Sequence, residues 1–321
     1  MRINDFCGRV CYFGKLPGRA DFIRSSEGAP ILDQLDAWVG LGLELAATDP
    51  GWKAGYDAAA PLDFAFLGTR KSFALVGRLM PSQDASQRRF PFMAATAIPC
   101  ESSQLGYFPR VFASAWHALA AGMRGVLNGA DPRAFEAEPL PLPAFDDAAI
   151  SAHREALGSH TLGSIEQVLR DAGHAINVRR SILALGLLLE PLLTRGDQSL
   201  QRGLALPLPE GEMGVEVACF WMAIVALFLA RGDFEICAIL TRRAGRPELM
   251  LAFSGAGARA LQAAFSRSAA DEFLVEICCA DWVDDYTDND NAIKKLSSYL
   301  EIPRLSLRQA LESFGDAFFR R

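Results

Sequence analysis

Short apolar runs between turn residues constrain the first third of this 321-residue chain more than any other feature. Residues 62–66, 73–79 and 92–98 are apolar runs of strand length. A turn of glycine and charged residues separates the first two runs, which indicates an antiparallel pair. Residues 9–13 predict another short strand, which ends before Pro17 because proline cannot continue a strand ladder.

Helical spacing predicts the elements that pack on these strands. Pro30 suits the first turn of a helix, and the segment should end near Asp49-Pro50-Gly51. A second helix is expected over residues 106–127. The apolar residues at helical spacing in the first helix are Ile31, Leu35, Trp38, Leu41 and Leu45.

The rest of the chain alternates helices with a second group of strands. Four prolines make 131–147 the clearest break, and a helical block follows to about residue 195. We interpret 204–210 as a further proline-marked connection. The later elements are an apolar helix (215–230), a hairpin (235–241 and 248–254), a helix (256–266), a strand (273–278) and two final helices (292–300 and 306–319).

These elements predict an α/β fold with a mixed, largely antiparallel central sheet. Helices should pack on both faces, giving a three-layer sandwich with a helical insertion. We expect one domain over residues 1–321. Its parts are a motif-bearing core (1–128), a variable linker and helical insertion (129–210), a helix–hairpin–helix–strand segment that completes the fold (211–290), and C-terminal helices (291–321).

Charge and composition disfavour several classes of partner. A net charge of -6 argues against nucleic acid and against an anionic membrane surface. The N-terminus lacks the apolar core of a secretory signal, and the apolar run 217–230 is shorter than the ~20 residues that span a bilayer. The seven cysteines are odd in number and mostly lie in apolar runs, which favours reduced thiols and a cytoplasmic protein.

Two glycine motifs suggest nucleotide chemistry. The P-loop pattern fails around Gly14-Lys15, because its first glycine is missing and Leu16 follows the lysine where Ser or Thr is needed. Gly255-Ala256-Gly257-Ala258-Arg259-Ala260 fits a dinucleotide motif better, and Glu276 lies where a ribose-binding acid would be expected. The preceding strand should be paired in a hairpin, whereas that site requires a parallel βαβ unit.

No other pattern predicts catalysis, a cofactor or a metal. The acidic stretch 281–290 lacks the glycine and glutamate that a calcium loop needs, so we interpret it as a solvated loop whose Asp290 or Asn291 caps the next helix. The histidines and cysteines have no metal-ligand spacing, and there is no serine nucleophile elbow. We therefore predict a protein that is not an enzyme.

Three motifs in the first third resemble one family. They are Gly14-Lys15-Leu16-Pro17 followed by Asp21-Phe22, the segment from Gly77 to Asp84 with Pro81-Ser82, and Arg88-Arg89-Phe90-Pro91; a tryptophan helix around Trp38 lies between the first two. In this order and spacing, residues 9–99 resemble the TagF family, also called ImpM, of type VI secretion system-associated proteins. Ala20 and Gln87 replace two family glycines, which restricts the backbone wherever a positive φ is needed.

The resemblance implies regulation. TagF-like proteins are cytoplasmic accessory proteins with an α/β sandwich fold, which repress type VI secretion after translation and act with a forkhead-associated (FHA) domain protein that promotes assembly. The alternatives are a nucleotide-binding enzyme that uses residues 255–260 and a structural subunit of the secretion apparatus. The sequence leaves the oligomeric state open.

The motif residues allow two interpretations. They can shape the turns and satisfy the loop backbone, or they can form one polar patch at neighbouring loop ends that docks a partner. If the motif is architectural, the partner surface would lie elsewhere, for example on the acidic stretch 281–290. The candidate partner-binding residues are Lys15, Arg19, Asp21, Trp38, Ser82, Asp84 and Arg88.

Overall fold

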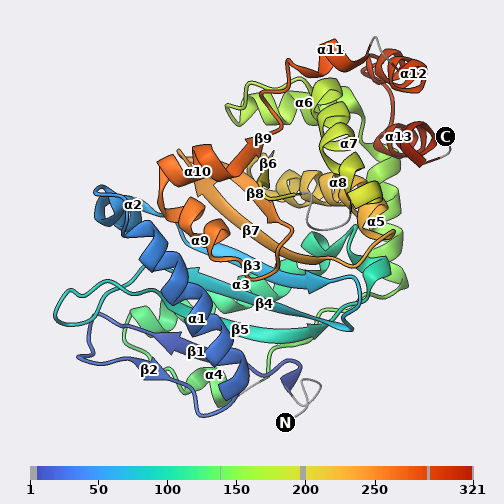
Figure 1. Cartoon of the computed structure of the whole chain (residues 1–321). Helices are drawn as coiled ribbons and strands as arrows, with labels where there is room; N and C mark the ends of the chain where they lie inside the picture. Colours follow the sequence, from blue (N-terminus) through green and yellow to red (C-terminus); the bar gives the residue numbers. More distant parts are fainter. Residues whose placement is uncertain (1–5, 138, 196–199, 288–289, 320–321) are drawn as a thin grey trace.

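One open sheet forms the centre of the molecule (Figure 1). The structure is a computed structural model that describes residues 6–137, 139–195, 200–287 and 290–319. The strands of this part are β1 (Cys11–Gly14), β2 (Ile23–Arg24), β3 (Leu62–Gly68), β4 (Phe73–Met80), β5 (Phe92–Pro99), β6 (Gly203–Pro207), β7 (Glu235–Arg243), β8 (Arg246–Ala252) and β9 (Leu274–Glu276). Their order is β2-β1-β5-β4-β3-β7-β8-β6-β9. All neighbours are antiparallel except β6 and β9, so the predicted mixed, largely antiparallel sheet is confirmed.

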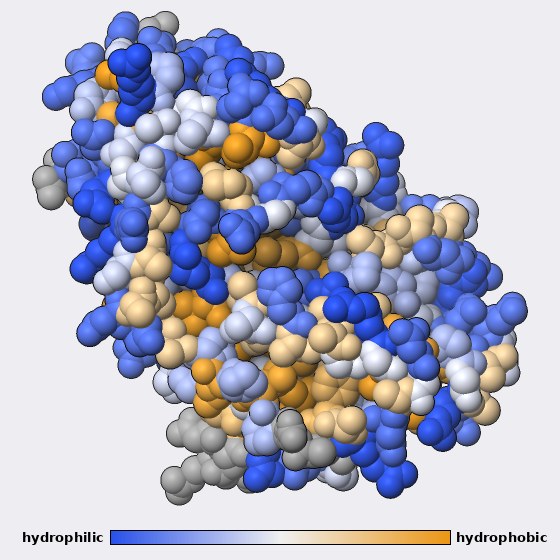
Figure 2. Space-filling view, turned by 180° about the vertical axis from the view of Figure 1, so that it is seen from behind, coloured by the Kyte–Doolittle hydropathy of each residue, from blue (hydrophilic) through white to orange (hydrophobic). Residues whose placement is uncertain are grey.

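Helices cover both faces of this sheet. The helices on the front face in Figure 1 are α1 (Ala29–Ala46), α2 (Trp52–Ala58), α9 (Ala258–Phe265) and α10 (Arg267–Phe273). The remaining helices are α3 (Phe108–Leu127), α4 (Ala134–Ala137), α5 (Asp147–Ser159), α6 (Leu162–Asp171), α7 (Val178–Arg195), α8 (Glu212–Leu229), α11 (Val283–Thr287), α12 (Asn291–Leu300) and α13 (Leu307–Phe319). From behind, the surface is mostly polar, with apolar residues in separate patches (Figure 2). The predicted helix layers on both faces are confirmed.

The sheet is continuous between the two halves of the chain. β3 from the N-terminal third pairs with β7 from the C-terminal third, with Asp63 opposite Leu240 and Gly68 opposite Glu235. The predicted hairpin is β7 and β8, whose register runs from Cys237 opposite Ala252 to the turn. The motif-bearing strands and the later strands therefore share one backbone hydrogen-bond network.

The interpretation of 204–210 as a connection is wrong for residues 204–207 and holds only for the residues that follow. Gly203–Pro207 is β6, a fully buried strand between β8 and β9. Pro207 is tolerated because it is the last residue of the strand, where its missing N–H leaves no ladder bond unmade. Its carbonyl oxygen accepts a hydrogen bond of 3.0 Å from Nε1 of Trp221.

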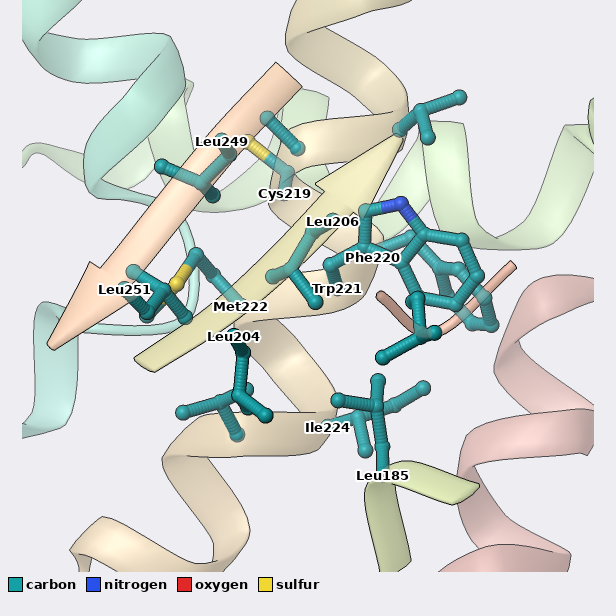
Figure 3. Close-up of a cluster of buried hydrophobic side chains, with 14 of the residues drawn as sticks. Leu185, Leu204, Leu206, Cys219, Phe220, Trp221, Met222, Ile224, Leu249 and Leu251 are labelled. Atoms are coloured by element: carbon teal, nitrogen blue, oxygen red, sulfur yellow. The ribbon is translucent and has the colours of Figure 1, made fainter. Parts of the chain in front are cut away.

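The apolar helix α8 belongs to the core. Within the described part of the chain, α8 is the one helix whose length (18 residues) and composition would allow it to span a membrane. Trp221 and its neighbours are buried against Leu185 of α7, Leu204 and Leu206 of β6, and Leu249 of β8 (Figure 3). This enclosure identifies α8 as a core helix of the fold.

Other elements differ from the sequence expectations in detail. The helix α2 and the edge strand β2 were not predicted, and the expected helix over 256–266 ends at Phe265, where Ser266 caps α10. The acidic stretch contains the short helix α11, and Asp290 caps α12 as predicted. Leu41 and Leu45 were predicted to lie on the apolar face of α1, yet both side chains are exposed, because they stand at the edge of the buried face.

A cross-strand ion pair lies beneath α3. Asp63 of β3 and Arg78 of β4 are register partners, and their side chains pair at 2.6 Å while largely buried. Burial raises the pKa of Asp63, and Arg78 only partly opposes this effect. The pair therefore resembles buried ion pairs whose attraction barely repays their desolvation.

We expect Asp63→Leu to lower the free energy of unfolding by about 2 kcal/mol, because it leaves a largely buried guanidinium without its partner. Asp63→Leu/Arg78→Leu should return to within about 1 kcal/mol of the wild type. Because the folded pKa of Asp63 is raised, the wild type should lose stability as the pH rises through that pKa, and the double variant should lack this loss. Urea unfolding across pH measures both effects; a double variant less stable than the single one would contradict the interpretation.

Candidate functional site

The motifs form two loops at one end of the sheet. We call residues 15–22 and 81–91 the motif loops. The first follows β1 and the second joins β4 to β5, and these three strands are adjacent, with both Gly14 and Met80 paired to Phe92. Gly14 has a φ of 132°, and a Cβ there would lie 2.1 Å from the carbonyl oxygen of Pro91. Only glycine permits this close approach of the two loops.

The buried carboxylate of Asp84 joins the two loops. One of its oxygens accepts hydrogen bonds of 2.9 Å from the backbone N–H groups of Ser86 and Arg88. The other pairs with Nε of Arg88 at 2.6 Å and with Nζ of Lys15 at 3.0 Å. The side chains of Asp84 and Lys15 are both buried, so this cluster is a packed structural centre.

These contacts keep Asp84 ionised. Burial alone would raise the pKa of Asp84, but the hydrogen bonds from the Arg88 N–H, Lys15, the Arg88 side chain and the Ser86 N–H outweigh it. The pKa of this carboxyl is therefore held well below its usual range. An ionised group so fully bonded is suited to holding the loops and has no lone pair to spare for a ligand.

Ser82 belongs to the same structural centre. Its hydroxyl donates a hydrogen bond of 2.7 Å to the carbonyl oxygen of Lys15. The phenol of Tyr56, on α2, donates to the Ser82 carbonyl oxygen at 2.9 Å and accepts from the Ser82 N–H at 3.0 Å. Burial raises the pKa of Tyr56, which stays a protonated donor. Tyr56 was missed from the sequence, because α2 was not predicted and tyrosine in a polar segment carries no signal for this contact.

The outer surface of the motif loops is exposed. Arg19 and Asp21 are exposed, and within the described residues no side-chain hydrogen bond or ion pair involves Asp21. Phe22 is 53% exposed, packs edge-on against Phe90 at 4.8 Å, and lies beneath Nζ of Lys15 at 5.0 Å. Arg88 reaches this surface from the buried cluster, where its Nη2 donates to the Ala20 carbonyl oxygen. We call Arg19, Asp21, Phe22 and Arg88 the loop surface.

The structure thus separates the predicted partner-binding residues of the motif loops into a buried or half-buried group and an exposed group. Lys15 and Asp84 are buried and paired, and the half-buried Ser82 bonds to the Lys15 backbone. Arg19, Asp21 and Arg88 are exposed. Phe22 was not among the candidates, although the sequence motif contains it. An exposed aromatic side chain braced by a second ring is the kind of anchor that dominates protein interfaces.

Trp38 lies apart from the loop surface, within the α1 layer. Its ring packs against Phe64 at 5.2 Å and edge-on against Phe66 at 5.0 Å. Its Nε1 donates to the carbonyl oxygen of Gly257 at 3.3 Å. Because its side chain is buried, Trp38 fixes α1 on the sheet and presents nothing to a partner.

The two glycine replacements have different consequences. Gln87 has a φ of 62°, a left-handed conformation that strains a residue with a side chain. Ala20 is not among the described residues with a positive φ, so glycine is not required there. The sequence expectation of a restricted backbone therefore applies to Gln87.

The alternative sites have other roles in the structure. β8, which precedes Gly255, is antiparallel to both of its neighbours, so the parallel βαβ unit of a dinucleotide site is not formed around it. Glu276 pairs with Arg243 at 2.7 Å. Two residues of the acidic stretch, Asp281 and Asp284, pair with Arg180 of α7. Within the described residues, no three or more His, Cys, Asp and Glu side chains group as metal ligands.

Comparison with known proteins identifies the N-terminal part. Residues 11–138 match the family model of the TagF N-terminal domain, described as type VI secretion system-associated. These residues belong to the TagF family. The chain is also similar to PA0076 from Pseudomonas aeruginosa PAO1, a crystal structure, at 27% identity and a TM-score of 0.35, over 43% of this chain and 64% of that one. No curated protein matches the chain. Both motif loops lie within the matched TagF domain.

We expect Gln87→Gly to raise the free energy of unfolding by about 0.5–1 kcal/mol, because glycine adopts a φ of 62° without strain. The control is Gln83→Gly in the same loop. Gln83 is exposed and is not among the residues with a positive φ, so its substitution should be destabilising. Chemical denaturation compares the two, and a loss of stability in both variants would contradict the strain at Gln87.

We expect Asp84→Asn to lower the Tm by several degrees at neutral pH, because the amide cannot pair with Lys15 and Arg88. Since the folded pKa of Asp84 is depressed, its stabilisation is complete above the usual value of 3.8 and is lost as the pH falls toward the folded pKa. The Tm difference should therefore be constant above about pH 5 and shrink below about pH 4. Asp36→Asn, an exposed carboxylate on α1, is the control and should leave the Tm unchanged at every pH.

Proposed function

We propose that this protein is a cytoplasmic negative regulator of type VI secretion that acts after translation, by binding an FHA-domain assembly factor. The observation that carries the proposal is the TagF N-terminal domain over residues 11–138. That match supports an association with type VI secretion, and the regulatory role and the FHA-domain partner follow from the resemblance of the motifs to TagF proteins.

The loop surface is the proposed contact. It combines an exposed aromatic ring with two cations and one carboxylate, on loops that the buried Asp84 cluster holds in place. Such preorganised loops lose little conformational entropy on binding. An aromatic anchor ringed by charged groups provides both affinity and specificity.

The proposed role is not enzymatic. Burial raises the pKa of the thiols, so they are poor nucleophiles at neutral pH. The pKa rises to about 12 for each of Cys11, Cys100, Cys219 and Cys278. All seven cysteines are free thiols, which supports a reducing compartment such as the cytoplasm.

The test uses Arg19→Glu/Phe22→Ala in the full chain. We expect binding of the purified FHA-domain protein to weaken at least about tenfold, because the anchor ring and one cation are removed. In cells that lack the wild-type protein, this variant should fail to repress secretion. Arg133→Glu/Tyr299→Ala makes comparable changes at exposed positions outside both the loop surface and the acidic stretch 281–290, and should bind and repress normally.

Two outcomes would refute the proposal. One is a wild-type protein that does not bind the FHA-domain protein and whose deletion leaves secretion unchanged. The other is a deletion that abolishes secretion, which would favour a structural subunit of the apparatus. If the wild type binds but the loop variant binds equally well, the contact lies elsewhere on the chain.

A further inference from the structure

An open apolar cavity of about 360 Å³ lies at the end of the sheet remote from the motif loops. Its floor consists of Phe66, Phe73 and Leu75 from β3 and β4, and its wall of Ile31 and Leu35 from α1. The three floor side chains are only partly buried, since the first turns of α1 do not close over them. A cavity of this size and lining is suited to a large apolar side chain or ring.

Two exposed leucines follow the cavity along α1. Gln34 lines the cavity rim, and Leu41 and Leu45 follow seven and eleven residues later, on the same side of the helix. Leu41 is 54% and Leu45 36% exposed. Single exposed leucines are common, but these two lie in one row along the helix with Gln34 at the cavity rim, so one continuous segment can reach both the leucines and the cavity.

Charge around this surface is negative. The helix α1 contains Asp33, Asp36 and Glu44 and no lysine or arginine. Asp33 pairs with Arg24 at 2.6 Å, whereas no ion pair in the described part of the chain involves Asp36 or Glu44. The cavity rim adds no net positive charge, because Lys71 pairs with Glu235 at 3.3 Å.

This charge distribution decides between occupants. A second copy of the chain that packed α1 against α1 would bring like-charged carboxylates together as their solvent is excluded, which is unfavourable. A segment with an apolar side flanked by lysine or arginine would cover the leucines and pair with Glu44, which follows Leu41 by three residues and precedes Leu45. Helices of that kind bind grooves through apolar anchors spaced three, four and seven residues apart.

We propose that α1 and the adjoining cavity dock a basic amphipathic helix of a partner protein. One large apolar side chain of that helix would fill the cavity, and further apolar side chains of the same helix would pack against Leu41 and Leu45. This surface is separate from the loop surface and does not depend on the proposed function. Gly42 packs directly against Leu261 of α9, so α1 is fixed and the surface exists before the partner arrives.

The test uses a fluorescent helical peptide of leucine and lysine with one tryptophan, titrated against the full chain. We expect saturable binding that Leu41→Lys/Leu45→Lys weakens by about tenfold or more, because it removes the apolar contact and repels the lysines. Leu142→Lys/Ile302→Lys, at other exposed apolar positions, adds the same charge and should bind like the wild type. Hydrogen exchange should show protection of α1 by the peptide.

Any of four results would overturn the proposal. They are no saturable binding, equal weakening by the two double variants, equally tight binding of a leucine–glutamate peptide, or a wild-type dimer that Leu41→Lys/Leu45→Lys dissolves. The last result would assign the surface to a second copy of the chain. Peptide binding that persists in Arg19→Glu/Phe22→Ala separates this proposal from the loop-surface function.

Discussion

The ionised carboxylate of Asp84 determines the shape of the motif loops. It is buried where water cannot solvate it, so every oxygen lone pair must be satisfied by the protein. Lys15 comes from the loop after β1, whereas Ser86 and Arg88 come from the loop between β4 and β5. The charge can therefore be buried only when both loops are in place, which makes their two conformations mutually dependent.

The sheet could largely be predicted because its signals are local. Apolar runs of strand length and turns between them located β3, β4, β5 and the β7–β8 hairpin. The strand β6 was missed because two prolines within a few residues are a stronger local signal than three apolar residues. Only its position between β8 and β9 shows that Pro207 stands at the strand end, and that position is a tertiary property.

The candidate site could be predicted only in outline. Lysine, arginine and aspartate in turn-rich loops look alike in a sequence, whether they face the solvent or each other. The structure buries Lys15 and leaves Arg19 exposed, although both lie in the same short loop. What separates them is the carboxylate of Asp84, which lies some seventy residues away and meets Lys15 only through the pairing of β1, β5 and β4. A missing family glycine marked both Ala20 and Gln87, but only Gln87 is left-handed, so the sequence could locate this strained position only as one of two candidates.

The loop surface and the cavity beside the first turns of α1 lie at opposite ends of the same strands. β4 begins at Phe73 on the floor of the cavity and ends at Met80 beside the motif loops. At ~3.3 Å per residue, this eight-residue strand separates the cavity from the motif loops by roughly 25 Å. That distance exceeds the Debye length of about 8 Å at physiological ionic strength, so charges at the cavity rim have little direct effect on the loop surface. Two partners could occupy the cavity and the loop surface at the same time, and the continuous sheet would fix the geometry between those partners.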